Sequence, residues 1–462
     1  METETTSING SVTVGASGHK AELKRVLKTR DLVIFGMVFM APVSAQTLFG
    51  SLAQVSQGHA VLSYIVGLVA MIFTAYSYGK MAEAFPIAGS TYSYTSRAIH
   101  PYVGFIAGWC MLLDYVLIPI LLYKLSAIYA MELLPSIPLW LMLLLFVVPV
   151  TVFNCIGTQI ASRVNTFMTA IMVISIVLFV GFAIKALLHG VGVGSVFSMQ
   201  GIYNAQTFTW PSLIGGASIA VLSFLGFDAV TTMAEDSSVS GKMVGKAAVL
   251  ACIVSAVLYV AQVYFATLTF PNFTAFQSPD TAFFEIATLV GGSGLATLLA
   301  LIISLSGIST ALAGQAAASR LLYGMGRERV LPKFFAHIHP KYKTPAYSIL
   351  FMAAAGYIGA VLIDLSVLFL IIVFGALIGF LCVNLSVFIE YYIKRKERSF
   401  TAFVPYVVFP LAGLVVCAYI MWGMDRIGHI VGGSWLALGI IYLAIMSKGF
   451  TKKVEMFKED SF

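Results

Sequence analysis

The sequence predicts an all-α integral membrane protein with twelve transmembrane helices, and composition and segment length lead to this prediction. Hydrophobic residues make up 59% of the 462 residues and charged residues only 10%, whereas a soluble globular protein carries about 25% charged residues. The apolar segments are about 20 residues long, which is the length that a helix needs to cross a bilayer. The strands of a membrane barrel would be about half as long and would alternate in polarity.

Twelve apolar segments follow one another along the chain, and short polar connections separate them. They cover residues 32–55, 60–85, 103–133, 139–156, 164–188, 211–233, 247–270, 284–316, 347–364, 367–391, 404–422 and 432–446. Several exceed 20 residues, so we expect tilted helices or helices that extend beyond the bilayer. We therefore divide the chain into an N-terminal tail (1–30), a transmembrane domain (31–448) and a C-terminal tail (449–462). The N-terminal tail lacks a hydrophobic signal core followed by a cleavage site.

The basic residues predict the orientation of the chain in the membrane. If the twelve segments span the bilayer, 24 of the 27 lysine and arginine residues lie in tails and connections on one side. Lys and Arg concentrate on the cytoplasmic side of membrane proteins. We therefore expect a multi-pass protein of the cell membrane whose N- and C-termini are both cytoplasmic. The net charge of +7 is then explained by topology and by attraction to anionic lipid, and no nucleic-acid partner is expected.

The first apolar segment is interrupted near its middle. The residues concerned are Pro42, Val43, Ser44, Ala45, Gln46 and Thr47. Proline removes a backbone hydrogen bond and clashes with the preceding helical turn. One interpretation is a proline kink whose hydroxyl groups bond back to the helix. The other is an unwound segment, which at membrane depth is tolerated only against protein or a water-filled cavity.

The sixth apolar segment contains a glycine, two aromatic rings and a carboxylate within the residues Ser223, Phe224, Leu225, Gly226, Phe227, Asp228 and Ala229. A charge at this depth costs about 2.5–3.5 kcal/mol on insertion scales. Asp228 could be paired with another segment, for example through Lys124, or could belong to a binding site. Two interrupted helices, five segments apart, predict an inverted-repeat transporter with its site at the midplane of the bilayer.

Other polar residues lie within the apolar segments. Asp114, beside Tyr115, is a second carboxylate at membrane depth, and Lys124 lies about 15 Å further along the same helix. The hydroxyl groups of Ser304, Ser306, Ser309 and Thr310 could coordinate a sodium ion or could permit close helix packing. Cysteine and histidine residues show no metal-ligand spacing, so neither a metal nor another cofactor is expected. The basic segment 320–332 is interpreted as a surface helix at the headgroups, with gating as the alternative.

Three motifs in order carry a resemblance to a known family. They are residues 85–94 followed by Gly108-Trp109, residues 223–230, and residues 318–327. The chain resembles amino acid–polyamine–organocation (APC) permeases over nearly its whole length. The resemblance implies the LeuT fold, a five-plus-five inverted repeat (31–188 and 211–391) with two extra C-terminal helices (404–446). It also implies secondary active transport of an amino acid or amine.

Within that family the chain is most similar to bacterial putrescine importers, at residues 58–60, 77–80, 112–115, 227–232 and 383–388. Two departures stand out. The break at residues 42–46 has no glycine, although amino-acid members usually carry a glycine-rich break there, and it has Gln46 or Thr47 where putrescine importers carry an acidic residue. Residues 165–183 also lack the lysine that titrates in some proton-coupled members.

The leading hypothesis is a proton-coupled importer of a small cationic or zwitterionic amine. Residues 42–47 and 223–228 would form the site, with Phe224 and Phe227 covering or gating it. Asp228 or Asp114 would meet an ammonium group or take up the coupling proton, and Ser306, Ser309 and Thr310 are the candidates for sodium. The alternative is a neutral amino-acid transporter or exchanger, and a channel ranks below both. An enzyme is not expected, because the sequence offers no nucleophile–base pair.

Overall fold

The computed structural model describes residues 28–85, 90–156, 159–232, 239–327, 332–342 and 344–451. Within these ranges the regular structure is helical. The α-helices are α1 (Thr29–Met40), α2 (Ser44–Val55), α3 (Ala60–Ala84), α4 (Ser90–Ala98), α5 (Pro101–Met131), α6 (Leu139–Ile156), α7 (Gln159–Leu188), α8 (Trp210–Leu222), α9 (Ala229–Thr232), α10 (Gly241–Thr269), α11 (Ala282–Arg327), α12 (Ala346–Leu362), α13 (Leu365–Val387), α14 (Phe400–Phe403), α15 (Phe409–Trp422) and α16 (Arg426–Met446). Short 3₁₀-helices (Met199–Gly201, Pro279–Thr281, Lys333–Ala336) and π-helices (Phe388–Lys394, Val404–Val408) lie between or beside them.

The helices confirm an all-α membrane architecture. Nine helices in the described ranges are long and apolar enough to cross a membrane, or ten if the bent pair α1 and α2 counts as one span. At the sixth and ninth predicted spans lie the shorter apolar helices α8, with 13 residues, and α12, with 17 residues. The count of twelve spans and the five-plus-five layout remain predictions.

Both predicted interruptions are present as breaks between helices. α1 and α2 meet at an angle of 47° across residues 41–43. Ala41 there has φ 45°, a left-handed conformation that non-glycine residues seldom adopt. Between the end of α8 and the start of α9, residues 223–228 leave the helical conformation. The first break is therefore narrower than the predicted 42–47, because Ser44 already begins α2.

The basic segment after the eighth apolar segment is not a separate surface helix up to its described end. α11 is kinked at Gly292, and the part after this kink runs through the basic segment to Arg327. The helix continues because Ala318 and Leu322 are buried against Met352 of α12. Residues 328–331 lie outside the described ranges. α4 is a helix that the sequence analysis did not predict.

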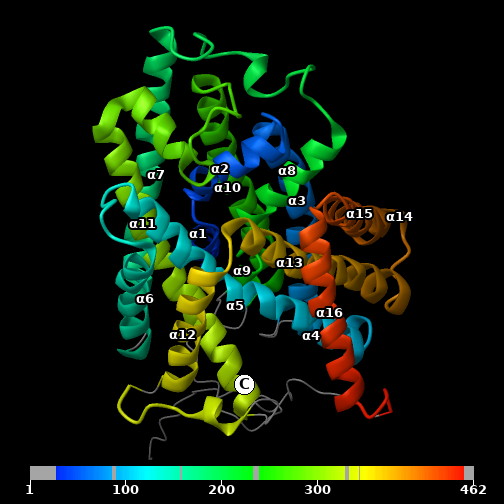
Figure 1. The fold of residues 1–462 in the computed structure, drawn as a ribbon. Coiled ribbons are helices and arrows are strands. Elements are labelled where there is room, and N and C mark those ends of the chain that lie inside the picture. Colours follow the sequence, from blue (N-terminus) through cyan, green and yellow to red (C-terminus); the bar gives the residue numbers. More distant parts are fainter. Residues whose placement is uncertain are drawn as a thin grey trace, which may run out of the picture.

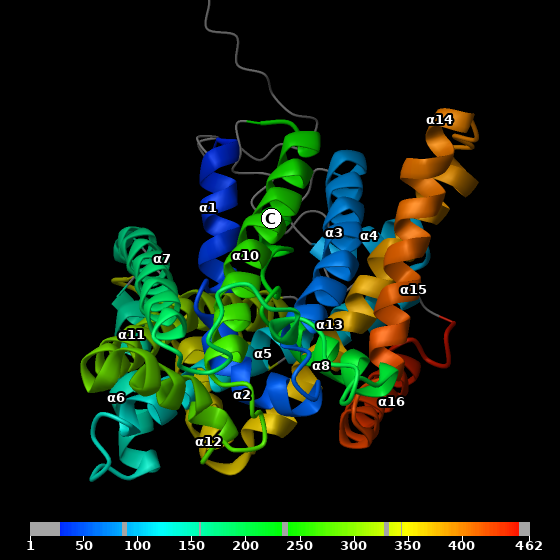
Figure 2. The ribbon, with the colours of Figure 1, turned by 90° about the horizontal axis from the view of Figure 1, so that it is seen from above.

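Small residues bring the helices around the centre close together. At the crossing of α3 and α10, Gly79 faces Gly245, and a Cβ on Gly79 would lie 2.5 Å from the Gly245 Cα. At the crossing of α13 and α5, a Cβ on Gly375 would lie 2.6 Å from the Cys110 carbonyl oxygen. Small residues allow such close backbone approach in membrane bundles. Figure 2 shows α1, α10 and α3 side by side, while α5 packs against α11, α12 and α13.

The connections define two ends of the bundle. The long connection between α7 and α8 runs over one end (Figure 1), where the Asn204 amide donates to Nε2 of His59 over 3.2 Å. At the other end of α3, Tyr391 donates to the carbonyl of Lys80 and Lys394 donates to the carbonyl of Arg97. Three basic residues of the predicted cytoplasmic side thus share one end.

Candidate functional site

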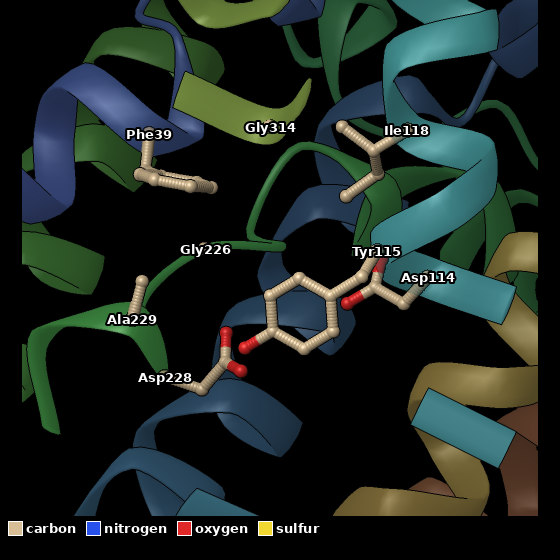
Figure 3. A pocket seen from close by; sticks show the side chains of 8 residues that line it. All are labelled: Phe39, Asp114, Tyr115, Ile118, Gly226, Asp228, Ala229 and Gly314. Carbon is tan, nitrogen blue, oxygen red and sulfur yellow. The ribbon is translucent and has the colours of Figure 1, made fainter. Parts of the chain in front are cut away.

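A small cavity lies between α5, α11, the end of α1 and the break after α8 (Figure 3). The volume that the centre of a water molecule can reach inside it is about 10 Å³. This is about the space that one water molecule needs. Its lining consists of Phe39, Asp114, Tyr115, Ile118, Gly226, Asp228, Ala229 and Gly314. The cavity is small and borders two carboxyl groups, and both charged side chains among its described lining residues are acidic.

The two carboxyl groups differ in how they are held. Asp228 is 3% exposed, and backbone N–H groups of the break, including those of Gly226 and Ala229, interact favourably with its carboxylate. Asp114 is 4% exposed, and its Oδ1 has no hydrogen-bond partner among the described residues. The two carboxylates are close enough to interact electrostatically. Asp114 therefore retains acceptor capacity that the fold does not use.

The Tyr115 ring lies between the two carboxyl groups. In Figure 3 its hydroxyl points toward Asp228, and the carboxyl group of Asp114 lies at the other end of the ring. The hydroxyl interacts electrostatically with both Asp228 and Asp114. Because Asp114 and Tyr115 are neighbours on α5, one helix supplies both a carboxylate and the ring beside it.

The break after α8 depends on a residue without a side chain. Gly226 has φ 110°, a conformation that is open to glycine and strained for other residues. A Cβ at this position would lie 2.8 Å from the Cβ of Phe39. Gly226 thus allows the chain to turn directly against the end of α1, and this turn aims Asp228 into the cavity.

Two side chains of α10 donate hydrogen bonds to backbone carbonyl groups that the breaks leave unpaired. The Tyr259 hydroxyl lies 2.7 Å from the carbonyl oxygen of Met40 and 2.7 Å from that of Ser223. Because it carries one proton, it donates to one of them at a time. One turn further on, Gln262 Nε2 donates to the Pro42 carbonyl over 3.0 Å. Neither residue was predicted from the sequence, although polar side chains three residues apart in an apolar segment lie on one helix face and indicate a shared role.

The two aromatic residues of the second break pack in different directions. Phe224 contacts the rings of Tyr64 and Tyr259, and Phe227 contacts those of Tyr78 and Phe380. Tyr64 and Tyr78 lie on α3, about 21 Å apart along the helix axis. Neither phenylalanine lines the cavity, so each packs in an aromatic cluster beside the site.

The structure brings together four of the predicted site residues, namely Asp114, Tyr115, Gly226 and Asp228. Pro42 and Val43 lie in the first break, while Ser44, Ala45, Gln46 and Thr47 form the first turn of α2, outside the cavity lining. Ser223 hydrogen-bonds the Tyr64 hydroxyl through its Oγ. Three lining residues were not predicted, namely Phe39, Ile118 and Gly314. Ile118 could have been predicted, because it lies one helical turn after Asp114 on the same face of α5.

The remaining hydroxyl groups mostly bond to their own helices. Thr47 donates to the Ser44 carbonyl, Ser306 to the Ile303 carbonyl and Thr310 to the Ser306 carbonyl. Ser309 is buried on the same helix. These bonds match the packing interpretation of the hydroxyls in α11, and a sodium site there stays a prediction.

Lys124 does not pair with Asp228. Its ammonium group donates to the carbonyl of Ile363 and interacts electrostatically with Asp364 and Asp280. Asp364 is the residue before α13, and Asp280 lies in the short helix before α11. The pairing of Asp228 with Lys124, considered from the sequence, is therefore wrong. Among the described residues that line the cavity, none is a basic partner for its carboxylates.

The spanning helices and their two breaks are those of a multi-pass membrane protein, and the family model and relatives place it among permeases and transporters, not enzymes. The family model described as "Amino acid permease" matches residues 44–454, and the chain belongs to this family. It is 31% identical to the "Low-affinity putrescine importer PlaP" of Escherichia coli K12, covering 95% of this chain and 97% of the relative.

Two relatives from Bacillus subtilis 168 carry other names. The chain is 23% identical to the "Branched-chain amino acid permease BcaP", covering 95% of this chain and 96% of the relative. It is 25% identical to a "Methylthioribose transporter", covering 94% and 96%. Full-length relatives of one family thus have chemically different substrates in their names.

Proposed function

We propose that the protein is a secondary active transporter that imports a small amine, such as putrescine or an amino acid, by alternating access and with proton coupling. One observation carries the proposal: two buried carboxylates, Asp114 and Asp228, line a cavity with no basic side chain among the described residues of its lining. A buried carboxylate needs a counter-charge or a proton. An ammonium group and a coupling proton are the two occupants that would supply it.

The breaks give the proposal a means of movement. Residues 41–43 and 223–228 separate helix segments that otherwise form continuous spans. Hinges of this kind absorb large changes of φ and ψ while the attached helices stay rigid. Because Asp228 lies in the second break, occupation of its carboxylate would bias the position of α9 relative to α8. We further propose that both termini face the cytoplasm.

The putrescine-importer name of one relative supports an amine substrate. A neutral amino-acid transporter or exchanger remains the second candidate, which the branched-chain permease among the relatives favours. Counterflow, in which unlabelled substrate inside the vesicles stimulates uptake of labelled substrate, would exclude a simple channel. A panel of labelled amines and amino acids would then separate the two candidates.

The test is uptake of labelled putrescine by the purified protein in proteoliposomes, with an imposed proton gradient. We expect uptake to fall about 10- to 100-fold in Asp228→Asn and Asp114→Asn, which corresponds to the loss of a hydrogen bond to a charged group. We expect wild-type uptake to fall when an ionophore collapses the gradient.

The matched control is Asp425→Asn. Asp425 is exposed and caps α16 by accepting from the Ile427 amide, and asparagine caps helices equally well. If both cavity variants keep wild-type, pH-dependent uptake while they elute and melt like the wild type, neither carboxylate recognises charge or couples protons.

A further inference from the structure

The two carboxylates of the cavity leave room for a second positive charge. Asp228 is already served by backbone N–H groups of its own break, whereas Asp114 Oδ1 has no partner in the described part of the chain. With a single ammonium group at Asp228, Asp114 would have to hold a proton to be neutral, and its Oδ1 would still lack a hydrogen-bond partner among the described residues. Two ammonium groups, one at each carboxylate, would leave neither carboxylate without a counter-charge.

The remaining lining of the cavity suits a hydrocarbon chain. Phe39, Ile118 and Gly314 line the cavity without polar side-chain atoms, and the Tyr115 ring lies between Asp114 and Asp228 (Figure 3). Methylene groups can pack against such a surface, and a cation beside the ring face gains from its quadrupole. Since the cavity has room for about one water molecule, the ring must turn aside before a longer ligand can extend between the carboxylates.

The same lining disfavours a carboxylate on the ligand. The nearest lysine along α5, Lys124, is bound to Ile363 and faces two other aspartates. The backbone N–H groups at Gly226 and Ala229, which could hold an anion, serve Asp228 instead. A ligand carboxylate would therefore meet two acidic side chains, and the one side-chain donor in the described lining, the Tyr115 hydroxyl, points toward Asp228.

We propose that Asp114 is the second-ammonium subsite of a two-point diamine site, with Asp228 holding the first ammonium. This inference rests on the proposed function and names the substrate class of that site. Bound in this way, a diamine links α5 to the break between α8 and α9. Asp114 then determines the preference for diamines over monoamines and amino acids.

The experiment compares three ligands with four carbon atoms each as competitors of labelled putrescine uptake in proteoliposomes: 1,4-diaminobutane, butylamine and 4-aminobutanoate. For the wild type we expect the diamine to compete about 10- to 100-fold better than butylamine, because it makes one more charge-assisted contact. We expect 4-aminobutanoate to compete more weakly than butylamine.

Asp114→Asn should reduce the gap between the diamine and butylamine to about threefold or less, mainly by weakening the diamine. Asp364→Asn is the control, since this carboxylate lies beside Lys124 and outside the cavity lining, and it should keep the gap. A wild-type protein on which butylamine or 4-aminobutanoate competes as well as the diamine would overturn the inference, and this comparison stands even if Asp114→Asn does not fold.

Persistence of the full gap in folded Asp114→Asn would overturn the inference too. Either result leaves the proposed function intact, because amines are still transported. The proposed function fails separately, if the wild type accumulates no amine or amino acid in sealed, energised vesicles.

Discussion

The two helix breaks of this protein are stabilised in different ways. At residues 41–43, the chain bends over three residues with no glycine and no charge, and partners on α10 donate hydrogen bonds to the buried carbonyls of Met40 and Pro42. At residues 223–228, the break is twice as long, turns at Gly226 and uses its own N–H groups to hold the Asp228 carboxylate. The first break is therefore held from outside, and the second largely from within.

The difference shows which of the two breaks can carry a functional side chain. An externally held break needs no special side chain of its own, since its neighbours satisfy the backbone. A break that folds around its own carboxylate places a charge at the point where the chain can move. The Tyr259 hydroxyl connects the two, because it lies 2.7 Å from one carbonyl oxygen of each.

The largest effect is expected where the second break cannot accept a side chain. Gly226→Ala would force alanine into a conformation at φ 110° and bring its Cβ to 2.8 Å from the Cβ of Phe39. The backbone strain alone costs about 1–3 kcal/mol. We expect a lower melting temperature in detergent and uptake reduced at least about tenfold, measured in proteoliposomes.

Gly181→Ala is the matched control for Gly226→Ala. Gly181 lies within α7, where a Cβ would meet nothing within 4 Å, so we expect an unchanged or slightly higher melting temperature. Equal behaviour of the two variants would show that the second break does not depend on glycine.

A smaller effect is expected from uncoupling the breaks. Tyr259→Phe keeps the ring that packs on Phe224 and Tyr64 but leaves two buried carbonyls without their shared donor, at a cost of about 1–3 kcal/mol. We expect a lower melting temperature and a changed maximal uptake rate. Tyr357→Phe, which loses an exposed hydrogen bond to Trp140, should change neither, and a silent Tyr259→Phe would argue against a link between the breaks.

The smallest effect is expected from loosening the first break alone. Gln262→Met removes the donor to the Pro42 carbonyl, worth about 1 kcal/mol. It also removes an Oε1 that has no partner within the described residues, which offsets part of the loss. The melting temperature should fall less than in Tyr259→Phe. Gln54→Met on α2 is the control, and a drop larger than that of Tyr259→Phe would reverse the ranking of the two contacts.

Much of the fold and part of the site could be predicted from local sequence. Apolar segment length predicted the spanning helices, and Pro42 and Gly226 predicted the two breaks, because these residues act on the backbone of their own segment. Asp114 and Asp228 were found because a carboxylate in an apolar segment is conspicuous. Their common cavity could not be read from spacing, since they are 114 residues apart.

The partners of the breaks were also beyond local reasoning. Tyr259 and Gln262 look like ordinary polar residues of an apolar segment until α10 is placed beside α1. Lys124 was weighed as a partner of Asp228, but the packing of α5 brings it to Ile363 and Asp364 instead. Likewise, the continuation of α11 to Arg327 depends on burial of Leu322 against Met352, a contact between distant segments.

The sequence by itself determined that this chain is an all-α membrane protein with two interrupted spans and two costly carboxylates. Hydrophobicity, proline, glycine and charge act over a few residues, so their effects can be read in order along the chain. Only the tertiary structure decided which of those groups face one another. The approach of α5 to the second break brings two separate carboxylates into one site, and segments this far apart in the sequence supply no local signal of their contact. It also decided that the first break is held by α10 and that the second holds itself.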